Sequence, residues 1–175
     1  EYVNNWDLKD AYPPSAWEAV TYEGEIYGVP AFAFVDWMYY RSDWFEEAGL
    51  EPPVTCEEFA AAAVALTNAD ENRYGFGMRG GDGGHGLLLG VLQSYGALSM
   101  VDGEVVVDED LFREAVQWYT DLYTVEGAVP PSVTGDSYRQ IMEGFKTGQT
   151  AMVWHHTGSL AEITAALEPE QFSTA

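Results

Sequence analysis

Two glycine-rich stretches of this sequence have the spacing of a nucleotide-binding loop. Residues 75–80 and 81–86 both match G-x-G-x-x-G, in which glycines bring the backbone close to a pyrophosphate. The second match is predicted to open a helix, and Asp102 lies downstream near the expected position of a ribose-binding acid. One hypothesis is therefore a nucleotide-dependent oxidoreductase that uses residues 81–86. Asp82 argues against it, because a carboxylate in the loop would repel the pyrophosphate.

The same loop also has the features of a small-molecule binding site. Glycine lets backbone N–H groups approach a ligand closely, and the start of the following helix adds partial positive charge. The guanidinium of Arg79 could donate paired hydrogen bonds to hydroxyls or to a carboxylate. We therefore predict that Arg79 and the neighbouring Gly80 contact a ligand. The alternative is a flexible connection between a strand and a helix.

Aromatic side chains crowd residues 31–40, a segment whose apolar character predicts a strand. Alternation along it would place Phe34 and Asp36 on one face and Trp37 on the other. Sugars bind aromatic rings through their C–H faces and planar polar groups through their hydroxyls. A second strand, predicted over residues 150–154, ends where ligands of α/β sheets bind. The residues that we predict to contact a ligand here are Phe34, Asp36, Trp37, Trp154 and His155. The alternative is that both faces are buried in a central sheet.

Metal binding and catalysis find little support in the remaining reactive residues. A zinc site needs three or four ligands, and the chain has three histidines, His85, His155 and His156. Neighbouring residues of a strand point in opposite directions, so His155 and His156 should not share a metal. There is also no G-x-S-x-G nucleophile motif. We therefore expect no metal, no cofactor and no catalytic residue.

The elements predicted along the sequence, which must position these candidate residues, are helices that alternate with short strands. This alternation indicates an α/β fold. Glu23-Gly24 predicts a hairpin over residues 20–27, and Val101 to Val105 resembles a second hairpin turn. Thr55 with Glu58 forms a capping box, and Asp108 and Asp136 are expected to begin further helices. Short strands are expected over residues 31–40, 73–78 and 150–154. Helices are expected over residues 15–20, 42–48, 56–66, 87–95, 109–123, 137–146 and 157–167.

Composition limits the class of protein further. The 175 residues suit one domain or one lobe of a larger protein. The 29 acidic and 7 basic residues give a net charge of −22, which argues against nucleic acid because phosphates need a basic face. A single cysteine, Cys56, excludes an intrachain disulfide, and we expect it to be a small buried side chain. The sequence begins with Glu1 rather than Met, and we expect an internal fragment.

Several motifs together resemble a known family. They are YEGEIYGVP at residues 22–30, the run YYRSDWFEEAGLEPPVTCEEF at residues 39–59, and FKTGQTAM at residues 145–152. The chain resembles the extracellular solute-binding proteins of ABC importers, most of all the sugar-binding family 1 group, which is similar to maltose-binding protein. Arg41 and Cys56 depart from this pattern, which has Asn and Trp at those places.

The resemblance implies a class II, periplasmic-binding-protein-like α/β fold, rich in helices around a short central sheet. Residues 1–34 would be the end of a first lobe, and residues 35–175 an incomplete second lobe after a hinge. The resemblance also places ligand-contacting residues near Phe34, in the loop from Arg79 to His85, and at residues 154–157, and it adds His85 to the predicted contacts. The implied function is non-enzymatic binding of a solute, a carbohydrate by preference, and its delivery to the transmembrane subunits of an ABC permease. The protein would act outside the cell, in the periplasm or anchored to the surface. Exposed cleft surface would favour a dimer of the fragment. A cell-surface adhesion module is a third hypothesis.

Overall fold

The computed structural model describes residues 2–175, and the chain divides into two compact units, Glu1–Val35 and Asp36–Ala175. The first unit contains the predicted hairpin, in which Glu23 (φ 48°) and Gly24 (φ 81°) form the turn. Positive φ at both central residues suits the twist of a two-residue hairpin. The elements of this unit are η1 (Val3–Asn5), η2 (Lys9–Ala11), α1 (Pro14–Glu18), β1 (Thr21–Tyr22) and β2 (Glu25–Ile26).

The strand predicted over residues 31–40 is only half as long as expected. Strand β3 covers Asp36–Tyr40, and residues 31–35 belong to neither a strand nor a helix. Phe32, Phe34 and Val35 are exposed by more than half of their surface. A strand requires a hydrogen-bonding neighbour as well as apolar side chains, and no strand pairs with these five residues.

The second unit is built on a four-stranded sheet with the order β4-β7-β3-β8. Strand β7 (Thr150–His156) pairs with β3 in antiparallel fashion and with β4 (Tyr74–Phe76) in parallel fashion. Met38 lies opposite Trp154, and Trp37 lies opposite His155. Since side chains alternate along a strand, these two pairs occupy different faces of the sheet.

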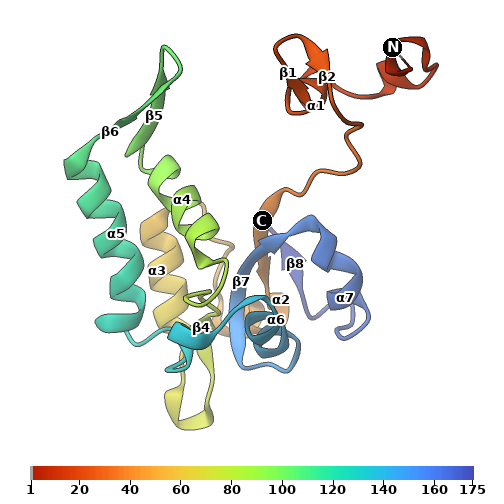
Figure 1. Cartoon of the computed structure of the whole chain (residues 1–175). Coiled ribbons are helices and arrows are strands. Elements are labelled where there is room, and N and C mark those ends of the chain that lie inside the picture. The colour runs from red at the N-terminus through yellow and green to blue at the C-terminus, as the bar shows by residue number, and fades with distance from the viewer. Residues whose placement is uncertain (1) are drawn as a thin grey trace. The chain divides into compact units, whose positions relative to one another are not determined.

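Helices cover both faces of this sheet, as Figure 1 shows. Helices α3 (Cys56–Ala65), α4 (Gly84–Ser94) and α5 (Glu109–Thr124) pack with α2 (Ser42–Ala48) on the core that contains Met38, Phe76 and Met152. Helices α6 (Tyr138–Lys146) and α7 (Leu160–Thr164) pack on a second core around Tyr39 and Val153. Between α4 and α5 the strands β5 (Leu98–Val101) and β6 (Glu104–Val107) form the second hairpin. No helix of the part that the structure describes is long and apolar enough to cross a membrane.

Most of the helix boundaries predicted from capping residues are confirmed. Thr55 and Glu58 form the capping box of α3, and the Asp108 side chain accepts hydrogen bonds from the first turn of α5. Helix α6 is an exception, because its capping box uses Ser137 and Gln140 rather than Asp136. The predicted helix 157–167 is also wrong in part, since it divides into η5 (Thr157–Ser159) and α7. The remaining 3-10 turns are η3 (Ala69–Glu71) and η4 (Val133–Gly135).

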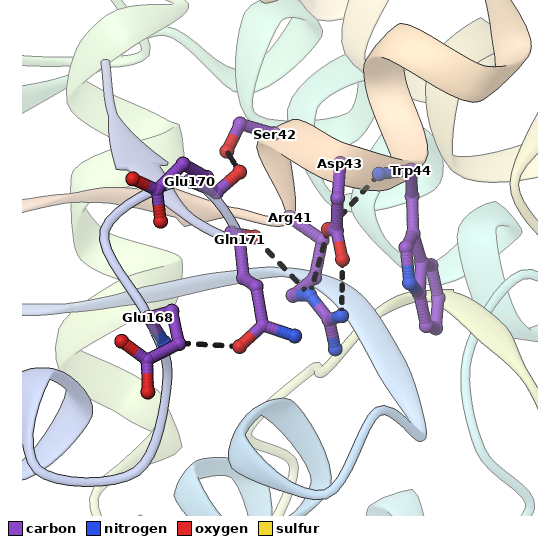
Figure 2. Close-up of polar contacts among 7 residues, drawn as sticks. All are labelled: Arg41, Ser42, Asp43, Trp44, Glu168, Glu170 and Gln171. Atoms are coloured by element: carbon purple, nitrogen blue, oxygen red, sulfur yellow. Dashed lines mark hydrogen bonds and ion pairs between the residues drawn. The ribbon is translucent and has the colours of Figure 1, made fainter.

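The edge strand β8 (Ser173–Thr174), which the sequence pattern did not reveal, is held in place by Arg41. The buried guanidinium of Arg41 forms an ion pair with Asp43, and its Nε lies 3.2 Å from the carbonyl oxygen of Gln171 (Figure 2). The Ser42 hydroxyl donates to the carbonyl of Glu170 at 3.0 Å (Figure 2). Arg41, which departs from the family pattern, therefore ties the segment before β8 to the start of α2.

Replacing Arg41 with lysine is expected to lower the free energy of unfolding by about 1–3 kcal/mol, because lysine cannot contact carboxylate and carbonyl with one planar group. Denaturant unfolding measures this loss. The matched control is Arg113→Lys, whose exposed pair with Glu109 on α5 should change stability by less than about 0.5 kcal/mol. Equal effects of the two substitutions would show that Arg41 holds nothing in place.

Candidate functional site

The second unit contains a pocket with a volume of about 390 Å³ on the α3–α5 side of the sheet. The start of β3, the end of β7, the entry to α3 and one side of α4 all contribute to its wall. The residues that line it are Asp36, Trp37, Met38, Pro53, Val54, Thr55, Cys56, Phe59, Gly86, Leu87, Gly90, Val91, Ser94, Trp118, Trp154 and Ala175. The pocket therefore combines an apolar wall with one carboxylate.

Trp154 is the centre of an aromatic cluster beside this pocket. Its ring lies 4.9 Å from that of Phe59 and 6.4 Å from that of Trp118, with the two indoles near parallel at 24°. Tyr119 stacks on Trp154 at 6.0 Å, and burial raises the pKa of the Tyr119 phenol well above its usual range. Rings supported on several sides keep their orientation, so they offer a rigid surface to a ligand.

Asp36 supplies the charged group of the pocket. It is the first residue of β3, and its side chain is exposed. Among the described residues no hydrogen-bond donor or cation pairs with its carboxylate. His156, its register partner on β7, stacks against Tyr138 with ring centres 5.8 Å apart. The Asp36 carboxylate is therefore available to a ligand.

Cys56 lies at the pocket wall and is half-buried. The sequence predicted a buried core side chain instead. Burial raises the pKa of its thiol, and a hydrogen bond with Tyr95 partly offsets this effect. The pKa of Tyr95 is raised to about 12, mainly by burial and then by Cys56. The thiol is thus protonated at neutral pH and acts as an uncharged part of the wall.

The structure brings together three of the eight predicted ligand residues. Asp36, Trp37 and Trp154 line the pocket, whereas Arg79, Gly80 and His85 do not. The Trp37 ring itself packs beside Tyr39 on the other face of the sheet. Phe34 belongs to the first unit, where its ring lies 5.0 Å from that of Phe32.

The loop before α4 is held by its own contacts. The Nε of Arg79 donates to the carbonyl oxygen of Asp82 at 2.7 Å, and Gly80 lies so close to Val133 that a Cβ would meet its carbonyl oxygen at 2.6 Å. Glycine at this position is therefore explained by packing. Ligand contact by Arg79, Gly80 and His85 stays a prediction.

His155 lies on the opposite face of the sheet from Trp154. Only 3% of it is exposed, its Nδ1 is 2.6 Å from the Ser159 hydroxyl, and the backbone N–H of His156 donates to the same nitrogen. Burial, followed by His156 and Arg79, lowers the pKa of His155 to about 4. A side chain with this burial supports the α6 and η5 packing, and its contact with a ligand stays a prediction.

The expected opposite orientation of His155 and His156 is wrong. Their ring centres are 4.4 Å apart, and both rings contact Tyr138 on α6. The reason is that His156 is the last residue of β7 and the chain turns there into η5, so strand alternation ends. Within residues 2–175 no three His, Cys, Asp or Glu side chains gather as metal ligands.

Phe59, Trp118 and Cys56 line the pocket although the sequence did not single them out for binding. Phe59 lies within the predicted helix 56–66, and Trp118 lies within the predicted helix 109–123. Phe59 and Trp118 face the pocket because both pack against Trp154, and a periodic pattern on one helix cannot show which neighbouring helix it meets.

The topology argues against a dinucleotide-binding unit. Such a unit needs a parallel strand next to β4 directly after α4, whereas α4 leads into the separate β5–β6 hairpin and the neighbour of β4 is β7. Gly75, the first glycine of one G-x-G-x-x-G match, packs so closely on α3 that a Cβ would lie 1.9 Å from the carbonyl oxygen of Ala63. The oxidoreductase hypothesis therefore has no support.

Comparisons with known proteins agree with this structure. Residues 1–174 match the sequence model of a family described as bacterial extracellular solute-binding protein. A mannitol-binding protein of Pseudomonas aeruginosa is 26% identical over 147 residues, which cover 81% of this chain and 33% of that protein.

Two solved structures show the same fold. A solute-binding protein from Thermotoga lettingae, bound with α-D-tagatose, has a TM-score of 0.86 and 26% identity over 99% of this chain and 46% of its own. One from Agrobacterium vitis, with bound D-mannitol, has a TM-score of 0.82 and 25% identity over 99% of this chain and 44% of its own. This chain thus spans less than half the length of these relatives.

The expected α/β, periplasmic-binding-protein-like fold is confirmed, and the family resemblance rests on nearly the whole chain. The matched relatives include a mannitol-binding protein and solute-binding proteins solved with bound tagatose or mannitol. The chain belongs to the family of bacterial extracellular solute-binding proteins.

Proposed function

We propose that the protein containing this chain captures a carbohydrate or polyol outside the cell and delivers it to the transmembrane subunits of an ABC permease. The pocket of the second unit would form one side of the binding site. The observation that carries the proposal is the aromatic cluster around Trp154 beside the Asp36 carboxylate, in a fold shared with relatives bound to tagatose and mannitol. Binding would be reversible, with no covalent step.

The lobes are assigned in the same proposal. Residues 1–34 would end the first lobe, and residues 35–175 would form the second lobe, with closure of the two lobes around the ligand as the signal to the permease. The protein would work in the periplasm or anchored at the cell surface. Nucleic acid is not a partner in this proposal, and a dimer would form only through exposed cleft surface.

The wall chemistry suits a ligand with both C–H faces and hydroxyls. The Trp154 and Phe59 rings can cover the C–H face of a sugar, and the Asp36 carboxylate can accept hydrogen bonds from hydroxyls. Such a mixture of apolar surface and a few polar groups is typical of small-molecule sites. Phe34, Arg79, Gly80, His85 and His155 complete the predicted contacts.

Ligand entry can be measured at Cys56, because this single thiol lies in the pocket wall. Saturating D-mannitol or D-tagatose is expected to slow the reaction of Cys56 with a soluble disulfide reagent in the full-length protein, measured on the Cys56 peptide by mass spectrometry. The reaction is run at about pH 8.5, because a raised thiol pKa leaves little thiolate at neutral pH. NAD, which this topology does not fit, should have no effect.

A second thiol position gives the matched control. In the double variant Cys56→Ser and Val125→Cys the thiol would lie after α5, at a side chain that is 69% exposed and does not line the pocket. Its labelling rate should be the same with and without sugar. If a panel of sugars and polyols neither slowed Cys56 labelling nor raised the melting temperature, the proposed function would be wrong.

A further inference from the structure

The charges around the pocket are one-sided. Of its lining residues, Asp36 is the only one with an acidic side chain, and none is Lys, Arg or His. An anionic ligand would therefore meet a carboxylate and no cation within this pocket. A ligand with a positive group would meet both a carboxylate and aromatic faces.

The basic side chains of the second unit are engaged elsewhere. Arg41 pairs with Asp43, Arg113 with Glu109, and Lys146 with Glu143 and Glu162. Arg73 lies over the Trp44 ring at 3.8 Å, and Arg79 donates to the Asp82 carbonyl. Arg139 lies on α6, which covers the other face of the sheet from the pocket. None of these six lines the pocket.

We propose that the pocket selects a polyhydroxylated ligand that carries a protonated amine, such as an amino sugar, by pairing the ammonium with Asp36 beside the Trp154 and Trp118 indoles. The inference rests on the proposed function and names the class of its ligand. An ammonium donates up to three hydrogen bonds, and charge-assisted bonds to a carboxylate are stronger than those from hydroxyls. A cation is also attracted to the faces of tryptophan rings.

The rest of the chain favours the same ligand class. With a net charge of −22, residues 1–175 contribute a negative potential around the pocket, which raises the local concentration of cations and lowers that of anions. Two effects therefore disfavour the binding of sugars that carry a carboxylate or a phosphate: repulsion by the nearby Asp36 carboxylate and the long-range negative potential. Repulsion by Asp36 should persist at high salt, whereas the long-range potential should weaken.

The test is a calorimetric titration of the full-length protein with matched sets of three sugars that share a ring and differ in charge. The sets are glucose, glucosamine and glucuronate, with the corresponding galactose and mannose compounds. We expect the tightest ligand to be an amine, bound about tenfold more tightly than its neutral counterpart, and the acids not to bind. Asp36→Asn should remove that tenfold advantage, because it weakens the binding of the amine by more than it weakens the binding of the neutral sugar.

The control variant is Glu47→Gln, which removes one negative charge from the exposed side of α2, away from the pocket. This variant should keep the preference for amines, because the removal of one negative charge changes the long-range field of a chain with a net charge of −22 only slightly. Neutral sugars binding as tightly as amines, or a preference that survives Asp36→Asn, would overturn this inference and leave the proposed function intact. The same conclusion follows if polyols protect Cys56 from labelling but no amino sugar binds. If neither amines nor neutral sugars bind, both the inference and the proposed function are wrong.

Discussion

Gly75→Ala is expected to destabilise the protein by at least about 3 kcal/mol, because an added Cβ has no room in the present backbone. The Cβ would lie 1.9 Å from the carbonyl oxygen of Ala63 and 2.4 Å from its Cα. These are backbone atoms in the last turn of α3, so no side-chain rotation relieves the overlap. Helix α3 must move away from β4, and it carries Phe59 and Cys56 of the pocket wall.

Thermal and denaturant unfolding of the variant measure the loss, and sugar protection of Cys56 should weaken with it. Gly90→Ala is the matched control, because this helical glycine of α4 has no atom within 4 Å of an added Cβ. Alanine there should raise stability by about 0.5–1 kcal/mol through helix propensity. If the Gly75→Ala variant had the same free energy of unfolding as the native chain, β4 and α3 would not be packed as described.

Lowering the pH from 6.5 to 4.5 is expected to cost about 2 kcal/mol of stability through His155 alone. Its pKa falls from the ordinary 6.5 to about 4 in the folded chain, mainly because of burial. Below pH 6.5 His155 binds a proton in the unfolded chain but stays neutral in the folded chain, so acid favours unfolding. The loss ends once the pH falls through the folded pKa, since both states are then protonated.

The His155 effect can be separated from that of neighbouring groups. Hydrogen bonds from Lys146 and Tyr138 lower the pKa of Glu162. The contribution of this carboxylate to the stability of the folded chain is lost only as the pH falls below its ordinary pKa of 4.5. Unfolding free energies between pH 6.5 and 4.5 therefore report His155. His155→Asn, which cannot be protonated, should flatten the profile in this range, whereas His85→Asn at an exposed position should not. An unchanged slope in His155→Asn would refute the assignment.

Local rules read from the sequence located most elements of this fold. The capping box of Thr55 and Glu58 begins α3, Asp108 begins α5, and Gly49 ends α2 with a φ of 68°. These features depend on a few neighbouring residues, so the sequence contains what is needed to predict them. The family resemblance likewise depended on consecutive motifs, and a match over residues 1–174 confirms it.

Strand lengths and faces depended on partners far away in the chain. Residues 31–35 are as apolar as the strand that follows, yet only residues 36–40 find β7 and β8 as neighbours. Strand β8 was missed because its two residues acquire their structure from pairing with β3 and from the Arg41 contacts of the preceding segment. A hydrogen bond between residues 130 positions apart has no local signature.

The sequence by itself determined that this is an acidic α/β chain with aromatic residues suited to holding a solute. Only the tertiary structure decided which of them meet: Trp154 reaches the pocket, and His155, one residue later, is buried against Ser159. It also brought Phe59 and Trp118 from two separate helices to the same tryptophan. The physical reason is that a binding pocket is defined by long-range packing, whereas composition, caps and turns are fixed by neighbours in the chain.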